Sequence, residues 1–382
     1  MCRILLIGLG LLLVTACASV PEASLQEKNF LHDDAFDGFE QIKVETEQQV
    51  FSLDRSVTDY LEDNILTLTT PLERMDQLSE QLFNPEKINL LYQTNANGVA
   101  SQTFNSKTAN CLSMSILAYS MAKYVGLSVT FQDVVIPEFW NLREDVSFLN
   151  GHVNLVLFAK TPVNDGQAYK IDTLEVDFSD SFASSRFRKN PIGKKTALAM
   201  FYNNIGAEAL VAKDFNRAYA YFRQAMLTDP DYISGWSNLG VLYRMSGHYQ
   251  WAEQVYNAGL ALDDNNRNIL DNLVVLLEHT DRKEQADEIR WRINKQRQSN
   301  PYYHYFLGQQ EYQNGNWQKA IQHFRRAKTL NQFDHHFYFG LAKAYFELGN
   351  VDETRRNLNL ARRYAIDEQQ SNQYLTKLSL LH

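Results

Sequence analysis

The chain has 382 residues, which is long enough for two or three domains. Its formal net charge of -8 argues against nucleic-acid binding, because proteins that bind nucleic acids need a basic face. Aromatic residues are abundant, with 20 Tyr and 22 Phe, and this content is typical of a well-packed folded protein.

The first residues have the features of a signal peptide. Arg3 supplies a positive charge, and residues 4–14 form an apolar run that is too short to span a bilayer as a stop-transfer helix. The run ends in Leu13-Val14-Thr15-Ala16-Cys17, which resembles the lipobox of bacterial lipoproteins. The resemblance implies cleavage after residue 16 and lipidation of Cys17. The alternative is an ordinary secretory signal in which this cysteine is incidental.

Lipidation of Cys17 would anchor the chain stably, because two or more acyl chains hold a protein on a bilayer where a single chain is marginal. The residue that follows is Ala18 and not Asp, and in enterobacterial sorting this implies the outer membrane, facing the periplasm. Residues 17–35 are mostly polar and acidic. We expect them to form the lipidated cysteine and a tether, after a signal peptide at residues 1–16.

Residues 36–180 are expected to form an α+β domain in which helices pack on an antiparallel sheet. The pattern is mostly helical to residue 92. Apolar, β-rich segments at 153–158 and about 169–178 flank the turn Asn164-Asp165-Gly166 and predict a hairpin, and a further strand is expected at 129–135. The basic, Ser-rich and Gly/Pro-containing stretch that follows predicts a connector at residues 181–198.

Cys111 is the thiol that remains once Cys2 leaves with the signal and Cys17 is lipidated. Without a disulfide partner in an oxidising compartment, it is either buried and inert or retained for its reactivity. The sequence around it opens a long amphipathic helix that Gly126 closes. Cys111 therefore lies in the first turn, where unsatisfied N–H groups and the helix dipole stabilise a thiolate, the competent nucleophile.

The histidine that could activate this thiolate is found by elimination. His152 is the only histidine between residues 36 and 198, and it begins the first strand of the predicted hairpin. A third group should orient the imidazole, and the second strand offers Asp172 and Asp177. A turn centred anywhere from residue 162 to residue 164 leaves both aspartates open, with a slight preference for Asp172.

This order of Cys, His and Asp resembles the transglutaminase-like superfamily over roughly residues 40–180. The motifs that carry the resemblance are Asn110-Cys111-Leu112-Ser113, Gly151-His152-Val153-Asn154 and Asp165-Gly166-Gln167-Ala168-Tyr169-Lys170-Ile171-Asp172. The resemblance implies Cys111 as nucleophile, His152 as base and Asp172 as the group that orients the base, with Asp177 as the alternative.

Two positions depart from the pattern of that superfamily. Asn110 stands where a glycine usually precedes the cysteine, and its amide could offer an oxyanion donor. Asn154 stands where many members have an aromatic residue. No metal and no cofactor are expected, because one Cys and one His without a nearby ligand pair do not make a zinc site.

A strict 34-residue period organises the C-terminal half, with repeats at 199–232, 233–266, 267–300, 301–334 and 335–368. The second repeat shows the pattern most fully, with small Gly240 and Ala252 at positions 8 and 20 and large Trp236, Tyr243 and Tyr256 at positions 4, 11 and 24. This pattern resembles the tetratricopeptide repeat (TPR), which implies an all-α superhelix of helix pairs. A capping helix is expected at residues 369–382.

The third repeat is degenerate, because Val274, Asp281 and Arg290 replace the Gly, Gly and aromatic residues expected at positions 8, 15 and 24. It is predicted to be an irregular joint in the array. The array as a whole is either a groove that binds a protein or peptide partner or a scaffold that packs against its own N-terminal domain.

Joined together, the two halves resemble bacterial proteins that combine a transglutaminase-like domain with TPR repeats. They suggest a membrane-anchored periplasmic cysteine hydrolase or acyltransferase acting on peptide or amide bonds, whose repeats recruit a protein partner. The alternative is a non-catalytic TPR adaptor lipoprotein with a degenerate transglutaminase-like domain.

Overall fold

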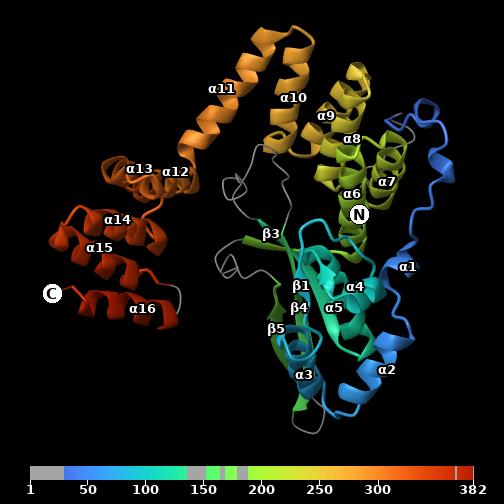
Figure 1. Cartoon of the computed structure of the whole chain (residues 1–382), viewed down its shortest axis with the longest axis horizontal. Coiled ribbons are helices and arrows are strands. Elements are labelled where there is room, and N and C mark those ends of the chain that lie inside the picture. Colours follow the sequence, from blue (N-terminus) through green and yellow to red (C-terminus); the bar gives the residue numbers. More distant parts are fainter. Residues whose placement is uncertain (1–29, 136–151, 164–167, 179–187, 366–367, 382) are drawn as a thin grey trace, which may run out of the picture.

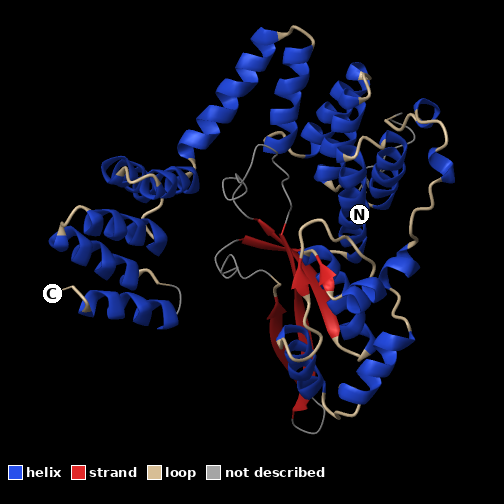
Figure 2. Ribbon diagram, in the orientation of Figure 1, coloured by secondary structure: helices blue, strands red, loops and turns tan. Residues whose placement is uncertain are grey.

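The computed structural model describes residues 30–135, 152–163, 168–178, 188–365 and 368–381 (Figure 1). Cys17 and the proposed signal peptide lie outside these residues. In the described part of the chain, no helix is both long and apolar enough to cross a bilayer. Figure 2 shows a sheet with helices against it in the N-terminal part, followed by helices alone.

The N-terminal part contains short and medium helices. In order they are η1 (Asp33–Ala35), η2 (Phe39–Gln41), α1 (Glu47–Phe51), α2 (Arg55–Asn64), α3 (Pro71–Phe83), α4 (Ala100–Ser106) and α5 (Cys111–Tyr124). Helix α5 is apolar nearly all round and lies in the centre of the domain, where its residues 112–122 are almost all buried.

Four of the described strands form an antiparallel sheet in the order β5-β4-β3-β6, which agrees with the expected α+β fold. Their bounds are β3 (Ser128–Val135), β4 (His152–Val163), β5 (Ala168–Val176) and β6 (Arg188–Ile192). A short parallel pair, β1 (Leu91–Tyr92) with β2 (Thr108–Ala109), leads the chain into α5. Alternate residues of β4, Val153, Leu155, Leu157 and Ala159, join α5 in one hydrophobic core.

The predicted connector at residues 181–198 differs from the structure. Strand β6 adds an edge to the sheet by pairing with β3, and Pro191 is tolerated there because an edge strand need not donate on both sides. The next helix, α6 (Lys194–Val211), begins directly after Gly193. Residues 188–198 are therefore part of the fold, and they join the sheet to the repeats without a free linker.

The helices of the array follow the 34-residue period in pairs. They are α6 with α7 (Phe215–Thr228), α8 (Ile233–Met245) with α9 (Tyr249–Leu262), α10 (Arg267–His279) with α11 (Lys283–Ser299), α12 (Pro301–Gln313) with α13 (Trp317–Leu330), and α14 (His335–Glu347) with α15 (Val351–Arg363). A last helix, α16 (Glu368–Ser379), packs on α15.

Glycine at position 8 lets an aromatic ring at position 24 lie directly on the facing backbone. A Cβ on Gly240 would stand 2.3 Å from the Tyr256 ring, and a Cβ on Gly308 would stand 2.6 Å from the Phe324 ring. Such distances are well inside van der Waals contact, so each glycine is needed for the close approach of its helix pair.

The third repeat lacks this contact, and the hydrophobic core is interrupted after it. Most buried apolar residues from the end of α6 to α11 form one cluster that ends at Ile293, whereas those of the last two repeats begin at Tyr305 in separate clusters. Figure 1 shows α11 running out from α10 to reach α12. The predicted irregular joint is therefore present between the third and fourth repeats.

The expected tether at residues 17–35 also differs from the structure where it is described. The ring of Phe36 stacks on Tyr219 at 4.3 Å, and His32 stacks on Trp251 at 3.8 Å. Asp33 accepts hydrogen bonds from Tyr219 and Arg223. Aromatic side chains spaced along residues 30–36 find partners on the repeats, so this segment is folded against the array.

Candidate thiol site

Cys111 is the first residue of α5, as the sequence predicts, and its side chain is partly exposed. Asn110 caps the helix, because its side-chain oxygen accepts a hydrogen bond from the Ser113 N–H at 2.9 Å. The Asn110 amide also donates to Asn97, whose own amide donates to Glu208 of α6 at 2.7 Å. The start of the cysteine helix is thus connected to the first repeat by side-chain hydrogen bonds.

His152, at the start of β4, is buried and lies against a carboxylate. Its Nε2 is 2.7 Å from Oδ1 of Asp177, which lies just beyond the end of β5. With Nε2 occupied by this contact, Nδ1 is the ring nitrogen that remains for the thiol of Cys111. The structure therefore groups Cys111, His152 and Asp177.

The electrostatics of His152 are consistent with this grouping. Burial lowers the pKa of the imidazole, but the hydrogen bonds and charge interactions with Asp177 and with Cys111 outweigh burial and raise the pKa to about 9. The imidazole therefore carries a proton at neutral pH. A histidine that can give and take a proton beside a thiol at the start of a helix is the arrangement of a cysteine nucleophile with its base.

The preference for Asp172 as the partner of His152 is wrong as far as the contact is concerned. Val163 pairs with Ala168, so the hairpin turn is centred between residues 165 and 166, beyond the range assumed from the sequence. In this register Asp172 lies opposite Ala159, on the face that holds the core, and it forms an ion pair with Lys170 at 2.7 Å. The alternative, Asp177, is the aspartate that reaches the histidine.

Three polar residues beside the site were not assigned a role from the sequence. Asn154, two residues after His152, is fully buried and donates to Glu175 Oε1 at 2.8 Å and to Asp177 Oδ2 at 3.4 Å. Lys189 of β6 reaches Glu175 at 2.5 and 2.6 Å. The period of two along β4 places Asn154 on the same face as His152, and this parity could have identified it.

The oxyanion donor suggested for Asn110 is already engaged. Its backbone N–H donates to Ala96 and its side-chain amide donates to Asn97. The backbone N–H groups of Cys111 and Leu112 belong to the first turn of α5, where helix geometry provides no partner within the helix. These groups are the donors that an oxyanion beside Cys111 could use.

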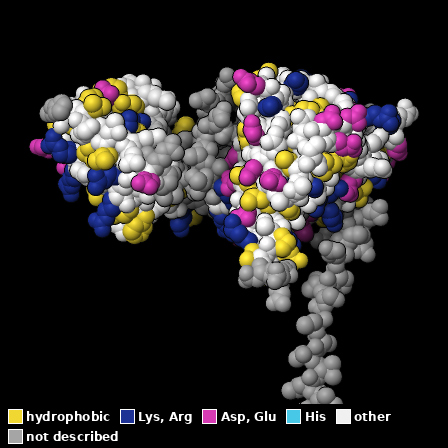
Figure 3. Space-filling model, turned by 90° about the horizontal axis from the view of Figure 1, so that it is seen from below, with side chains coloured by type: hydrophobic (Ala, Val, Ile, Leu, Met, Phe, Trp, Pro, Cys, Tyr) yellow, Lys and Arg dark blue, Asp and Glu magenta, His cyan; other side chains and the backbone are white. Residues whose placement is uncertain are grey.

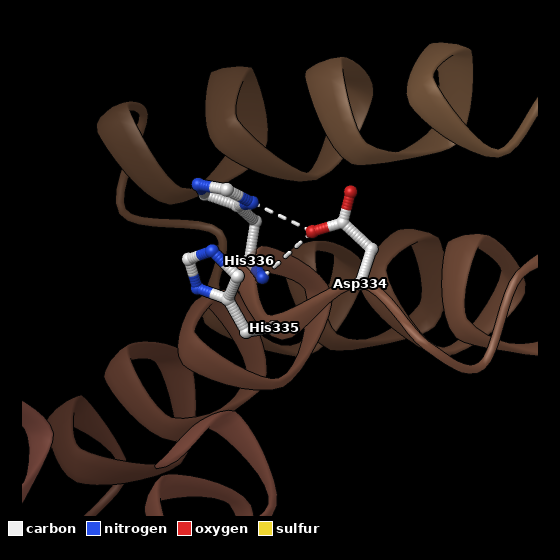
Figure 4. Close-up of side chains that lie close together, drawn as sticks. All are labelled: Asp334, His335 and His336. Carbon is white, nitrogen blue, oxygen red and sulfur yellow. Dashed lines mark hydrogen bonds and ion pairs between the residues drawn. The ribbon is translucent and has the colours of Figure 1, made fainter. Parts of the chain in front are cut away.

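A second cluster of side chains with metal-binding chemistry lies at the N-terminus of α14 (Figure 4). Asp334, His335 and His336 each bring one ligand atom within 4.8 Å of the others. Asp334 accepts from the His336 backbone and from Tyr302 of α12, and the His335 ring contacts Tyr374 of α16 at 2.6 Å. These contacts connect α12, α14 and α16, so we interpret the cluster as packing between repeats.

Comparison with known proteins identifies the repeats. The family model described as Tetratricopeptide repeat matches residues 233–266 and 301–334, which are the second and fourth repeats of the predicted register. The chain therefore carries TPR repeats. Repeats of this kind build extended surfaces on which other proteins dock, and protein–protein interaction is the function that these comparisons support.

Curated relatives match over short segments. Superkiller protein 3 of Schizosaccharomyces pombe is 23% identical over 149 residues, which are 32% of this chain and 11% of that protein. The uncharacterized protein ycf37 of Guillardia theta is 30% identical over 82 residues, 22% of this chain and 46% of that protein. The chain thus spans less than half the length of either relative.

Solved structures match about half of the chain, at low sequence identity and low TM-score. YrrB, described as a TPR protein with an unusual peptide-binding site, is 15% identical with a TM-score of 0.24 and covers 47% of this chain and 92% of its own. Pseudomonas aeruginosa pilF is 19% identical with a TM-score of 0.27 and covers 50% of this chain and 94% of its own.

Proposed function

We propose that this protein is an adaptor that binds a protein partner through its TPR repeats. The observation that carries the proposal is a pocket of about 290 Å³ between α12, α14, α15 and α16. Its wall includes Phe346 and Leu380, which are 58% and 72% exposed, together with Lys343 and Lys377. Exposed apolar side chains beside cationic ones are suited to an apolar, acidic segment of a partner.

The charge on this pocket supports an anionic partner. Burial and the nearby charge of Lys377 lower the pKa of Lys343, and the Lys343 ammonium lies 4.8 Å from the centre of the Tyr312 ring. A carboxylate from a partner would stabilise the charged form of both lysines. On the face drawn in Figure 3, both acidic and basic side chains are exposed.

Complementation of cells that lack the protein tests the adaptor role. Phe346→Glu should abolish function by placing a like-charged group against an acidic partner, whereas Phe333→Glu, on an exposed phenylalanine outside the pocket, should complement like wild type. Cys111→Ser should also complement. The adaptor proposal fails if Phe346→Glu is functional and Cys111→Ser, folded normally, is not.

A second candidate function, a thiol hydrolase or acyltransferase of transglutaminase-like type, is favoured by the grouping of Cys111, His152 and Asp177. In this reaction the Cys111 thiolate attacks a peptide or amide carbonyl, and the protonated His152 gives its proton to the leaving amine. The resulting thioester is resolved by water or by an amine, from which His152 takes a proton. Asp177 keeps the ring oriented and stabilises its charge.

Turnover of a candidate amide substrate tests this second function. The rate should fall by about 10³-fold or more in Cys111→Ala and in His152→Ala, because each residue acts in the same chemical step. Turnover that is unchanged in Cys111→Ala would exclude the thiol mechanism.

We also propose that Cys17 is lipidated and that the chain is anchored in a bacterial envelope, facing the periplasm. The lipobox-like sequence that ends at Cys17 supports this proposal. Metabolic labelling with a fatty-acid analogue should label the wild type and not Cys17→Ser. A wild-type chain that is cleaved but unlabelled would instead indicate an ordinary secretory signal.

A further inference from the structure

Asn154 lies at the centre of the polar face of the sheet, between β3 and β5. Its side chain has no exposed surface, and on β3 its paired residue is Gln132. The side-chain amino group faces two carboxylates on β5 and beyond its end, at 2.8 Å from Glu175 Oε1 and 3.4 Å from Asp177 Oδ2. One buried amide group is thus shared between two acids.

We propose that Asn154 is a positioning residue that, together with the Lys189–Glu175 ion pair, holds the Asp177 carboxylate in the orientation that engages His152. The proposal rests on the thiol function described above. It assigns a role to the position at which many transglutaminase-like proteins carry an aromatic residue.

The geometry of Asp177 explains why a second contact matters. Asp177 follows the last residue of β5, so the strand ladder does not fix its carboxylate. One oxygen, Oδ1, lies against His152 Nε2, and the other, Oδ2, lies against the Asn154 amide. Two contacts on opposite oxygens fix the plane of the carboxylate, and a fixed plane keeps the His152 ring in one orientation.

The ion pair with Lys189 prevents Glu175 from competing with Asp177 for the Asn154 amide. Glu175 and Asp177 are two residues apart and lie on the same side of the strand, so their charges repel. Lys189 neutralises Glu175 through contacts of 2.5 and 2.6 Å, and the Asn154 amide donates to both acids. Among the described residues, Cys111 and Asp133 of β3 also act on the charge of His152.

Asn154 contacts both carboxylates through its side-chain amino group, which is a hydrogen-bond donor. Among the described residues, its Oδ1 is buried without a hydrogen-bond partner. The Asn154 side chain is therefore held in place by its hydrogen bonds to Glu175 and Asp177. Asn154→Asp is nearly the same size but replaces the donor with an acceptor, so it should turn the Asp177 carboxylate away while it changes packing little.

The test is the pH dependence of iodoacetamide labelling at Cys111 in the full chain, followed on the Cys111 peptide by mass spectrometry. We expect Asn154→Asp to shift the acidic limb of the profile upward by about one pH unit, towards that of His152→Ala. Gln132→Ala is the matched control, because it alters the paired residue on β3 and does not touch Asp177. It should keep the wild-type profile.

A second variant covers the case in which Asn154→Asp does not fold. Lys189→Met leaves Asn154 in place but removes the charge that neutralises Glu175, and it should shift the profile in the same direction by a smaller amount. If folded Asn154→Asp and Lys189→Met both keep the wild-type profile while His152→Ala shifts it, the positioning role is wrong and the thiol pair stands. If wild type and His152→Ala share one profile, the thiol function fails and this role fails with it.

Discussion

Asp172 on β5 and Asp177 just beyond its end are five residues apart and face opposite sides of the sheet, and this parity selects the partner of His152. Asp172 lies on the side of the core and Asp177 on the side of the histidine. The sequence leaves little choice for the thiol and the histidine, which lie within hydrogen-bonding reach of each other in the structure. It does not fix the aspartate, because one residue of uncertainty in the turn exchanges the two faces.

The two aspartates give a direct test of this parity. Asp177→Asn should lower the pKa of His152 from about 9 by roughly two units, because burial then acts without the main carboxylate partner. Asp172→Asn should leave the pKa of His152 unchanged, since Asp172 pairs with the exposed Lys170. NMR titration of the His152 ring, assigned with His152→Ala, measures both. The reverse pattern would restore Asp172 as the orienting residue.

The raised pKa of His152 also predicts how stability depends on pH. The value is about 9 in the folded chain against 6.5 for an unperturbed histidine, so the folded state binds this proton more tightly. The stabilisation is fully present below pH 6.5 and is lost as pH rises through about 9. Its size is on the order of 3 kcal/mol. Urea unfolding between pH 6 and pH 9.5 should show this loss in wild type and a much smaller one in His152→Gln.

At the scale of elements, position 15 of each repeat ends a helix in the left-handed region. Gly247, Gly315 and Gly349 have φ between 71° and 86°, and the same position in the first and third repeats holds Lys213 at 61° and Asp281 at 57°. The 34-residue period predicts these helix ends closely, because the two helices of every repeat pack together in the same way and need the same turn between them. Strand β6 was missed because its basic, polar sequence carries no apolar alternation.

The left-handed position predicts a stabilising substitution. Lys213→Gly should raise the free energy of unfolding by about 0.5–1 kcal/mol, because the strain of a side chain at positive φ exceeds the extra entropy of glycine in the unfolded chain. Asp281→Gly should gain less, since Asp tolerates this region better. Gly247→Ala is the control, because no atom lies within 4 Å of its added Cβ, and it should lose a similar amount through the backbone alone. Chemical denaturation measures all three, and a loss in Lys213→Gly would contradict the argument.

At the scale of the whole molecule, the boundary between cooperative units differs from the boundary between domains read from the sequence. The core of the N-terminal part includes Phe201 and Tyr202 of α6 and Tyr221 of α7, and residues 30–36 pack on the first and second repeats. Sequence patterns show where helices α6 and α7 lie in the chain. They do not show whether the apolar side chains of these helices pack on the sheet domain or on the repeats. The degenerate third repeat was the sign in the sequence that the hydrophobic core of the array would be interrupted.

The interrupted core predicts that the last two repeats unfold separately from the rest. Phe222 and Phe324 are equivalent, since each is fully buried at position 24 against the glycine at position 8, and each should cost about 3–5 kcal/mol when replaced by Ala. Phe222→Ala should lower hydrogen-exchange protection from α5 to α10, because α6 and α7 contribute buried residues both to its cluster and to the cluster of the sheet domain. Phe324→Ala should lower protection only from α12 to α16.

If both variants lowered protection equally along the whole chain, the joint at α11 would transmit stability, and the adaptor pocket and the thiol site would belong to one cooperative unit. Protection that separates at α11 would mean that a partner bound at the pocket stabilises the last repeats without altering the thiol site.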